Sequence, residues 1–296
     1  MKMSKLSESI GRGFTLTTEL MPPRGADIKG FVEDVARVRS LSGITAVNVI
    51  DSPSARLHMS SLGASVMLLQ NGLEPIYQMV CRDRNCLALQ SDLLSASAFG
   101  IENVLALTGD HPARGASDHP FTKPVYDLDS TSLIAAIKKL NMSRDIIGRT
   151  LTGATSFTIG AAVSPTIDPA EPEALKVERK LAAGAQFFQS QAVFQSADIE
   201  SFMAIVEETL PEMRKKVLVG IIPLSSMRMI GFLNGLPGII VPEKIAARVK
   251  DAKDPQEEGV AVSTEIIDEI KSVGFGGAHI MPVGHLDSLE KILSAL

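Results

Sequence analysis

One complete strand–helix–strand unit lies within FTLTTELMPPRGADIKGFVEDVARVRSLSGITAVNVI, residues 14–50. Its first segment, 14–20, is short and mostly apolar or β-branched, a pattern typical of a strand. Apolar side chains then recur at helical spacing over 28–41, and 44–50 is again short and β-branched. A strand, a helix and a second strand in this order predict a parallel βαβ unit.

The same alternation continues along nearly the whole chain. Further strands are expected at 74–80, 102–110, 156–163, 185–194, 216–222 and 277–283. Further helices are expected at 55–71, 85–100, 130–140, 171–184, 199–210, 226–236 and 286–296, with two extra helices between Pro242 and Val273, before the last strand. Eight such units, without a glycine-rich phosphate loop after the first strand, favour a closed (β/α)8 TIM barrel over an open doubly wound sheet.

Length and linker composition indicate one domain. The chain has 296 residues, and a barrel of this class uses about 250. No stretch rich in Ser, Gly or Pro divides the sequence, so we expect a single catalytic domain over residues 1–296. The polar, Pro- and Gly-rich segment 111–124 is long enough to predict a functional or mobile loop.

Composition excludes several classes of function. The net charge is −5 without clustered Lys and Arg, which argues against nucleic-acid binding. No apolar run reaches the ~18 residues of a membrane span, and the N-terminus lacks an apolar signal core, so a cytoplasmic enzyme is expected. Cys81 and Cys86 have only the distant His279 and His285 as further ligands, which predicts reduced thiols and no metal site.

Polar residues fall where the predicted strands end. In a TIM barrel the chemistry gathers at the C-terminal ends of the strands. The polar residues at or near these ends are Glu19, Asp51, Ser52, Arg82, Asp83, Arg84, Thr108, Asp110, Ser164, Gln189, Gln191, Ser225, Ser226 and His285. Their convergence on one mouth, above apolar strand bodies, predicts a pocket.

Simpler structural roles are open for most of these groups. Asp110 could cap a turn, and Gln189 with Gln191 could form hydrogen bonds inside the barrel. Arg82 to Arg84 could be a solvated charge run. Glu173, Lys176 and Lys180 have the spacing of ion pairs on a helix surface.

Glu19 is harder to explain structurally. A carboxylate inside a barrel mouth has a large desolvation cost unless it is paired or functional. Burial favours the neutral form of the group, so Glu19 is a candidate proton donor. Arg24, after two prolines, is expected to pair with a nearby carboxylate or carbonyl.

Four segments together resemble the methylenetetrahydrofolate reductase family. They are FTLTTELMPPRG (14–25), NVLALTGDHP (103–112), VYDLDS (125–130) and KLAAGAQFFQSQAVF (180–194), in the family's order and spacing. The resemblance extends over about residues 14–290 and is to the short bacterial catalytic-domain form. CRDRNCLALQSDLL (81–94) and GGAHIMPVGH (276–285) are similar to the branch found in one-carbon and acetogenic metabolism.

The resemblance implies a flavoprotein TIM barrel that reduces 5,10-methylenetetrahydrofolate to 5-methyltetrahydrofolate, for example in methionine biosynthesis. It implies FAD and a nicotinamide donor such as NADH. Glu19 falls on the family's general acid, which protonates folate N10 so that the ring opens to an iminium ion that accepts hydride from the flavin. Asp110 falls on the aspartate beside flavin and folate, and Gln191 on the glutamine that binds the pterin.

The flavin contacts implied by the resemblance are Gln78, Thr108, Gly109, Asp110, Tyr126, Glu173 and Lys180. Gln78 stands where many members have histidine, and the segments 163–166 and 229–233 also depart from the family pattern. These departures leave open the electron donor (NADH, NADPH or a partner protein) and the alternatives of FMN or no retained flavin. The sequence also leaves open the direction of the reaction and a homo-oligomeric state. The alternative functions are a non-catalytic or partner-dependent folate-binding subunit and a barrel lyase or aldolase.

Overall fold

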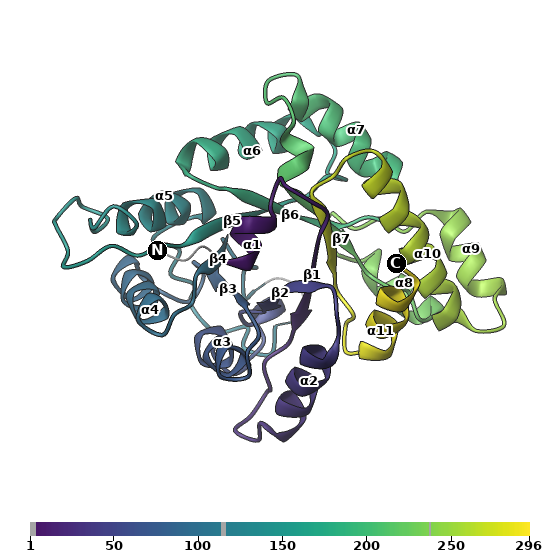
Figure 1. Cartoon of the computed structure of the whole chain (residues 1–296), viewed down its shortest axis with the longest axis horizontal. Coiled ribbons are helices and arrows are strands. Elements are labelled where there is room, and N and C mark those ends of the chain that lie inside the picture. Colours follow the sequence, from purple (N-terminus) through teal and green to yellow (C-terminus); the bar gives the residue numbers. More distant parts are fainter. Residues whose placement is uncertain (1–3, 114–116, 237) are drawn as a thin grey trace.

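Eight parallel strands form a closed barrel in the order β1 to β8, which confirms the predicted (β/α)8 fold (Figure 1). The computed structural model describes residues 4–113, 117–236 and 238–296, so part of the predicted 111–124 loop lies outside it. The strands are β1 (Thr15–Leu20), β2 (Ile44–Val49), β3 (Pro75–Val80), β4 (Asn103–Leu107), β5 (Thr158–Val163), β6 (Phe187–Ala192), β7 (Val217–Ile221) and β8 (Gly277–Ile280).

Helices surround this barrel on the outside, except for the first and shortest one, which covers an end of the barrel (Figure 1). They are α1 (Lys5–Ser9), α2 (Lys29–Ser40), α3 (Ser61–Gln70), α4 (Cys86–Ala98), α5 (Ser130–Leu140), α6 (Glu171–Ala183), α7 (Ser196–Glu207), α8 (Met227–Leu233), α9 (Glu243–Asp251), α10 (Pro255–Ser272) and α11 (Leu286–Ala295), with short 3-10 turns at η1 (Pro53–Ala55) and η2 (Met213–Lys216). Because α10 packs against β7, β8, α7 and α11, it occupies the barrel's helix position before β8, and α8 and α9 are additional. None of the helices in the described ranges is long and apolar enough to cross a membrane.

Several predicted boundaries were wrong by three residues or more, and two of them have a clear cause. The helix expected from residue 55 begins only at Ser61, because Ser52, Ser54 and Ala55 have positive φ angles and form an irregular turn. The last strand ends at Ile280 rather than residue 283, since Pro282 follows closely and cannot donate a ladder hydrogen bond.

The barrel interior is apolar in its lower part. Leu6, Ala46, Ile76, Leu105, Phe187 and Leu218 form one buried cluster there. The Phe187 ring fits because residue 160 is glycine: a Cβ at Gly160 would lie 2.3 Å from the ring. Above this cluster the interior becomes polar, so the candidate site rests on a packed apolar floor.

The short helix α1, which the sequence did not predict, covers the N-terminal end of the barrel (Figure 1). Its Leu6 is fully buried, and the Glu74 carboxylate accepts hydrogen bonds from the backbone N–H groups of Lys5 and Leu6. Ser4 Oγ donates to Asn103 Oδ1 at 2.7 Å. A five-residue helix carries too little periodicity for its sequence to indicate it.

Candidate active site

Glu19 and His279 face each other inside the barrel, from the neighbouring strands β1 and β8. His279 Nε2 lies 3.6 Å from Glu19 Oε2, and His279 Nδ1 lies 3.0 Å from Thr17 Oγ1. Thr17 and Glu19 are two residues apart on β1 and therefore point to the same face. The Glu19 side chain is 15% exposed, and the His279 side chain is 4% exposed. The carboxylate thus has a buried polar neighbour and retains limited access to the mouth.

A cavity of about 140 Å³ opens above this pair. It is lined by Glu19, Gln78, Ala162, Val163, Ser164, Gln189, Ser190, Gln191, His279 and Met281. The structure therefore brings together three of the predicted site residues, Glu19, Gln78 and Gln191. Among the described residues that line it, Glu19 is the only acid.

Gln189 and Gln191 lie on the same face of β6, as their spacing predicts, but they differ in environment. Asn48 Nδ2 donates to Gln189 Oε1 at 2.7 Å, and Gln189 Nε2 donates back to Asn48 Oδ1 at 3.1 Å. Gln189 is therefore an interior hydrogen-bonding residue. Gln191 is half-buried, and its Oε1 accepts from the backbone N–H of Ala192.

A second cavity, of about 410 Å³, lies beside the first. It is lined by Ala106, Leu107, Thr108, Asp129, Ser130, Thr131, Ala162, Ser164, Ile167, Glu173, Lys176, Arg179 and Lys180. Ala162 and Ser164 line both cavities, so the two adjoin at the end of β5. The first residues of α5 and three cationic side chains of α6 meet here. The N–H groups of Ser130 and Ser132 already donate to Thr108 and Asp129, so the positive charge of this cavity comes from the three side chains of α6.

Glu173 and Lys180 are buried, so the helix-surface interpretation of their spacing is wrong for Lys180 and incomplete for Glu173. Lys180 Nζ donates to the carbonyl oxygen of Ala162 at 2.6 Å, and burial lowers the pKa of the ammonium group. Glu173 accepts from the backbone N–H of Ser164 at 3.1 Å and pairs with Lys176 at 3.0 Å. Both residues thus form the wall of the second cavity.

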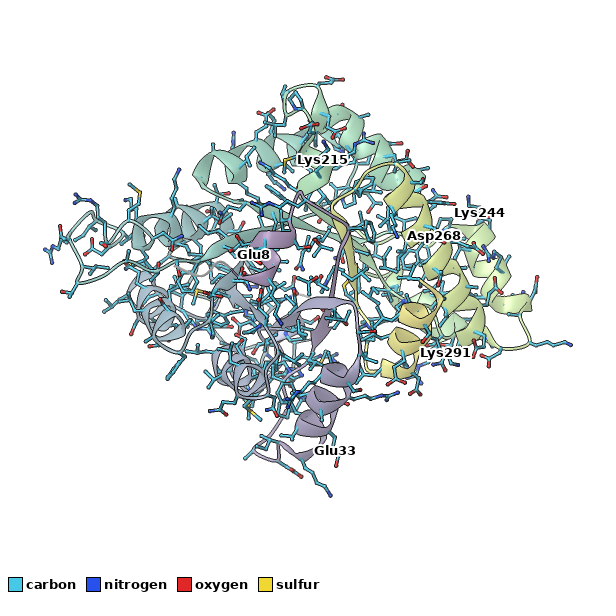
Figure 2. All side chains as sticks on the ribbon, viewed as in Figure 1. Glu8, Glu33, Lys215, Lys244, Asp268 and Lys291 are labelled. Carbon is cyan, nitrogen blue, oxygen red and sulfur yellow. The ribbon has the colours of Figure 1, made fainter. Side chains whose placement is uncertain are left out.

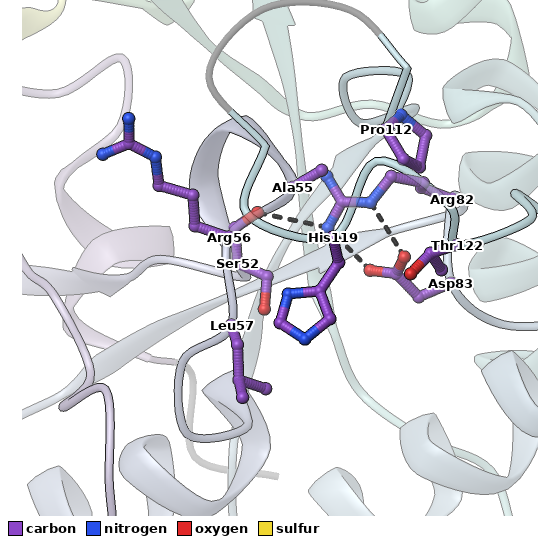
Figure 3. A pocket seen from close by; sticks show the side chains of 9 residues that line it. All are labelled: Ser52, Ala55, Arg56, Leu57, Arg82, Asp83, Pro112, His119 and Thr122. Carbon is purple, nitrogen blue, oxygen red and sulfur yellow. Dashed lines mark hydrogen bonds and ion pairs between the residues drawn. The ribbon is translucent and has the colours of Figure 1, made fainter.

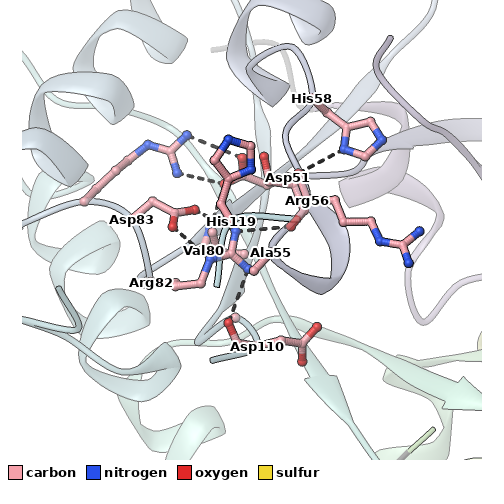
Figure 4. Close-up of polar contacts among 12 residues, drawn as sticks. Asp51, Ala55, Arg56, His58, Val80, Arg82, Asp83, Asp110 and His119 are labelled. Atoms are coloured by element: carbon pink, nitrogen blue, oxygen red, sulfur yellow. Dashed lines mark hydrogen bonds and ion pairs between the residues drawn. The ribbon is translucent and has the colours of Figure 1, made fainter. Parts of the chain in front are cut away.

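Arg82 is 2% exposed, so the alternative of a solvated charge run does not hold for this residue, whereas its neighbour Asp83 is exposed; Figure 4 shows their contacts. Its guanidinium donates to the Asp83 carboxylate at 2.6 and 2.8 Å and to the Ser52 carbonyl at 3.1 Å. A longer contact of 3.4 Å reaches the Asp110 carbonyl. One buried cation therefore joins the segments that follow β2, β3 and β4.

The neighbouring Arg84 is also sequestered. It pairs with the buried Asp51 at 2.8 Å and with Asp92 at 2.9 Å. Asp51 in turn accepts from the backbone N–H of Val80. These ion pairs join the ends of β2 and β3 to helix α4.

The loop after β4 is held by several contacts. Gly109 has φ +88° and packs against Val80 and Arg82, so a side chain at this position would be strained and crowded. Tyr126 Oη donates to the Gly109 carbonyl at 3.0 Å, and Thr108 Oγ1 accepts from the backbone N–H of Ser130. Asp110 is exposed on this loop rather than on the predicted strand, and it is not among the lining residues of either cavity.

A third cavity of about 250 Å³ lies next to this loop (Figure 3). It is lined by Ser52, Ala55, Arg56, Leu57, Arg82, Asp83, Pro112, His119 and Thr122. Its principal charged groups are already paired, Arg82 with Asp83 and His119 with Asp118. Asp118 also pairs with Arg24, which confirms the expected carboxylate partner of that arginine.

The cysteines are free thiols, and burial raises the pKa of Cys81 to about 12. Within the described ranges no group of three or more His, Cys, Asp or Glu side chains is arranged to hold a metal ion.

Two residues of the site were missed at the sequence level, His279 as the neighbour of Glu19 and Arg82 as a buried clamp. In GAHIMPV, His279 and Met281 alternate with outward residues, so the pattern does place the imidazole inside a barrel. The signal for Arg82 was absent, because adjacent charges of both signs are usually solvated.

Among known protein families, the model described as methylenetetrahydrofolate reductase matches residues 3–296 of this chain. A probable methylenetetrahydrofolate reductase (NADPH) from Caenorhabditis elegans is 25% identical over 294 residues, covering 94% of this chain. The chain spans only 41% of the length of that relative.

Two solved structures are similar in fold. An uncharacterised protein from Clostridium thermocellum that binds two copies of 5-methyl-5,6,7,8-tetrahydrofolic acid has a TM-score of 0.68 at 14% identity, covering 95% of this chain and 93% of its own. A 2,3-dimethylmalate lyase has a TM-score of 0.53 at 10% identity, covering 100% of this chain and 86% of its own. At these identities the likeness shows the barrel fold alone.

Proposed function

Because the chain belongs to the methylenetetrahydrofolate reductase family, we propose that it reduces 5,10-methylenetetrahydrofolate to 5-methyltetrahydrofolate with a bound flavin. The observation that carries this proposal is Glu19 in the barrel mouth. It is the acid of a cavity that also presents the amides of Gln78 and Gln191. A pocket that only bound folate would not need a carboxylate backed by a buried imidazole.

Glu19 acts as the general acid. Its carboxyl group delivers a proton to N10 of the folate, which opens the five-membered ring and leaves an iminium ion at N5. His279 and Thr17 hold the carboxyl side chain in position from below, through the contacts of 3.6 and 3.0 Å that join the three groups. General acid catalysis by a positioned side chain is worth about 10²–10⁴-fold in rate.

Gln191 positions the pterin. An amide presents both a donor and an acceptor, which matches the alternating donors and acceptors of a pterin edge. The packed pair of Asn48 and Gln189 beneath it keeps the floor of the cavity rigid. The C. thermocellum structure, with bound 5-methyltetrahydrofolate on the same fold, supports a folate as the substrate class.

The second cavity fits the diphosphate of FAD. Lys176, Arg179 and Lys180 supply positive charge suited to phosphate oxygens, and they outnumber the two carboxylates, Asp129 and Glu173, that also line the cavity. This arrangement favours FAD over FMN, which carries a single phosphate. When bound, the flavin supplies the electron pair that reduces the folate.

Further residues support this cavity and the loop beside it. Thr108 and Glu173 line its walls, while Gly109 and Tyr126 hold the adjoining loop through their hydrogen bond. Since the two cavities meet at Ala162 and Ser164, a flavin anchored in the second can extend toward Gln78 in the first. For Asp110 only the family resemblance supports a role beside the developing cation on the folate, because this exposed residue of the loop after β4 lines neither cavity.

Turnover of the FAD-loaded protein tests the proposal. Under anaerobic conditions NADH or NADPH should bleach the flavin absorbance, and 5,10-methylenetetrahydrofolate should restore it with formation of 5-methyltetrahydrofolate. Folate binding in a calorimeter without such turnover, with either donor, would instead support a binding subunit and contradict the enzymatic proposal.

A further inference from the structure

One buried cation lines a cavity at the mouth of the barrel. Charged side chains such as Glu33, Lys244 and Lys291 lie on the outer helices (Figure 2). Arg82 is 2% exposed, and its side chain forms part of the wall of the third cavity, of about 250 Å³ (Figure 3). Arginine does not lose its proton in proteins, so this guanidinium stays charged although it is buried. The third cavity therefore has a permanent positive charge in its wall.

The contacts of Arg82 leave one of its nitrogen atoms underused. Nε and Nη2 donate to the Asp83 carboxylate, and Nη2 also donates to the carbonyl oxygen of Ser52. Among the described residues, Nη1 has only a contact of 3.4 Å, to the carbonyl oxygen of Asp110 (Figure 4). An ordinary N–H···O hydrogen bond is shorter, at about 2.7–3.2 Å. Nη1 can therefore still donate to a ligand in the cavity.

Arg82 lies among residues for which the family resemblance implies flavin contacts. A Cβ atom added to Gly109 would lie 3.0 Å from the Val80 Cβ and 3.2 Å from the Arg82 Cβ, so Val80 and Arg82 share one face at the end of β3. Gln78 is two residues before Val80 on the same strand and therefore shares this face. Tyr126 donates to the carbonyl oxygen of Gly109 at 3.0 Å. A flavin that extends from the second cavity toward Gln78 thus lies on the face that carries Arg82.

The chemistry of flavin reduction gives this cation a role. Hydride transfer from a nicotinamide donor delivers two electrons and one proton to flavin N5. Unless a second proton follows, the reduced ring carries a negative charge over N1 and the C2 carbonyl. A fixed cation binds this anion more tightly than the neutral oxidised ring, which raises the reduction potential of the flavin. Given the proposed function, on which this role rests, we propose that Arg82 stabilises the reduced, anionic flavin and so sets the potential at which it accepts hydride.

Neighbouring carboxylates offset the charge of Arg82 only in part. The Asp83 side chain, which pairs with Arg82, is 37% exposed, so water screens its negative charge more than the buried positive one. The buried Asp51 is paired with Arg84 at 2.8 Å. The side chain of Asp110 is on the exposed loop after β4. The other titratable groups near this guanidinium or in the cavity wall are Arg56, His119 and Tyr126.

The ionisation of the reduced flavin in the wild type tests the proposal without any substitution. The FAD-loaded protein is reduced with dithionite under anaerobic conditions, and its absorbance spectrum is recorded as the pH is lowered. A nearby cation disfavours protonation of N1, so the reduced flavin should stay anionic to a pH about one unit below that for free reduced FAD. Protonation at the same pH as free FAD would overturn the role of Arg82 alone. A protein that binds no FAD would contradict the proposed function itself, and with it this role.

Substitution then assigns the effect to Arg82. Arg82→Gln should weaken the binding of reduced FAD relative to oxidised FAD by about 10-fold or more, which lowers the two-electron potential by about 30 mV or more. Arg82→Lys keeps the charge and should retain most of the wild-type potential. The matched control is Arg56→Gln, because Arg56 is an exposed cation of the same cavity whose side chain points away from Arg82 in Figure 3.

The control should change the potential far less than Arg82→Gln does, since water screens an exposed charge. Equilibration with a reference dye measures the potentials, and circular dichroism checks that each variant is folded. A folded Arg82→Gln variant with the wild-type potential, or an equal shift in Arg56→Gln, would overturn the proposal. If Arg82→Gln does not fold, the wild-type pH titration and the Arg82→Lys potential decide it.

Discussion

Glu19 shows what a single position could and could not reveal. Its place in the barrel mouth follows from the strand pattern and from the rule that barrel chemistry lies at the C-terminal strand ends. The strand pattern does not reveal that His279 is its neighbour. Thr17 and His279 are 262 residues apart and come together only because β1 pairs with β8 when the barrel closes. The sequence identified the acid, and barrel closure supplied the residues that hold it.

His279 is expected to position Glu19. Replacement by Gln removes the imidazole that contacts both Glu19 and Thr17, so the carboxyl group becomes less well oriented. The rate of flavin reoxidation by 5,10-methylenetetrahydrofolate should fall about 10-fold, a part of the ~10²–10⁴-fold owed to the acid itself. Stopped-flow measurements should show flavin reduction by the nicotinamide donor unchanged. A matching loss in both half-reactions would point to general damage instead.

Lys180 predicts a pH dependence of flavin binding. Burial lowers the pKa of its ammonium group, so it loses its proton at a lower pH than an ordinary lysine, whose pKa is about 10.4. The positive charge proposed to bind the diphosphate then disappears, and FAD affinity should decline as the pH rises toward ~10. Lys180→Arg keeps its charge throughout this range and should remove that part of the decline. Parallel affinity curves for wild type and variant, from fluorescence titration of FAD, would exclude this role.

At the scale of elements, the long periodic segments were predicted well and the irregular ones were not. Helix α5 was predicted with its observed bounds, because its apolar spacing is clear and Asp129 caps its first turn. Helix α1 was missed, since five residues carry little pattern. The Arg82–Arg84 segment was misinterpreted because burial of a charge depends on partners from other loops, such as Ser52 and Asp51.

Arg82 should be important for stability. Arg82→Ala would remove the hydrogen bonds that join the ends of β2, β3 and β4, including those to the carbonyl groups of Ser52 and Asp110. Hydrogen bonds to charged groups contribute about 1.5–3 kcal/mol each, so a loss of about 2–3 kcal/mol in the free energy of unfolding is expected. Urea denaturation measures it, with Arg39→Ala on the exposed surface of α2 as the control. A change no larger than that of the control would show that the clamp is dispensable.

At the scale of the whole molecule, eight alternating units were enough to predict a closed barrel. The alternation could not show that two cavities adjoin at the end of β5, because that depends on how β5 and α6 pack. It could not show that Lys180 is buried against Ala162 for the same reason. The fold could therefore be predicted from the sequence, whereas the second cavity depends on tertiary contacts that the sequence does not show.

In the apolar floor of the barrel, the packing of residues 160 and 187 is expected to be coupled. Gly160→Ala would place a Cβ 2.3 Å from the Phe187 ring, and overpacking of this kind costs about 1–3 kcal/mol. In a Phe187→Leu background the smaller side chain leaves room, so the added methyl should cost much less. The unfolding free energies of the four proteins in this double-mutant cycle measure the coupling. If the effects of the two substitutions on the free energy of unfolding are strictly additive, the Phe187 ring does not restrict the side chain at residue 160.

The central claim is that Glu19 delivers a proton to the folate and takes no part in the reduction of the flavin. Stopped-flow comparison of the two half-reactions in wild type and Glu19→Gln tests it most directly. The account predicts that the variant is reduced by the nicotinamide donor at the wild-type rate, while its reoxidation by 5,10-methylenetetrahydrofolate is slower by about 10²–10⁴-fold. Wild-type reoxidation in the variant, or an equal loss in both half-reactions, would contradict the claim.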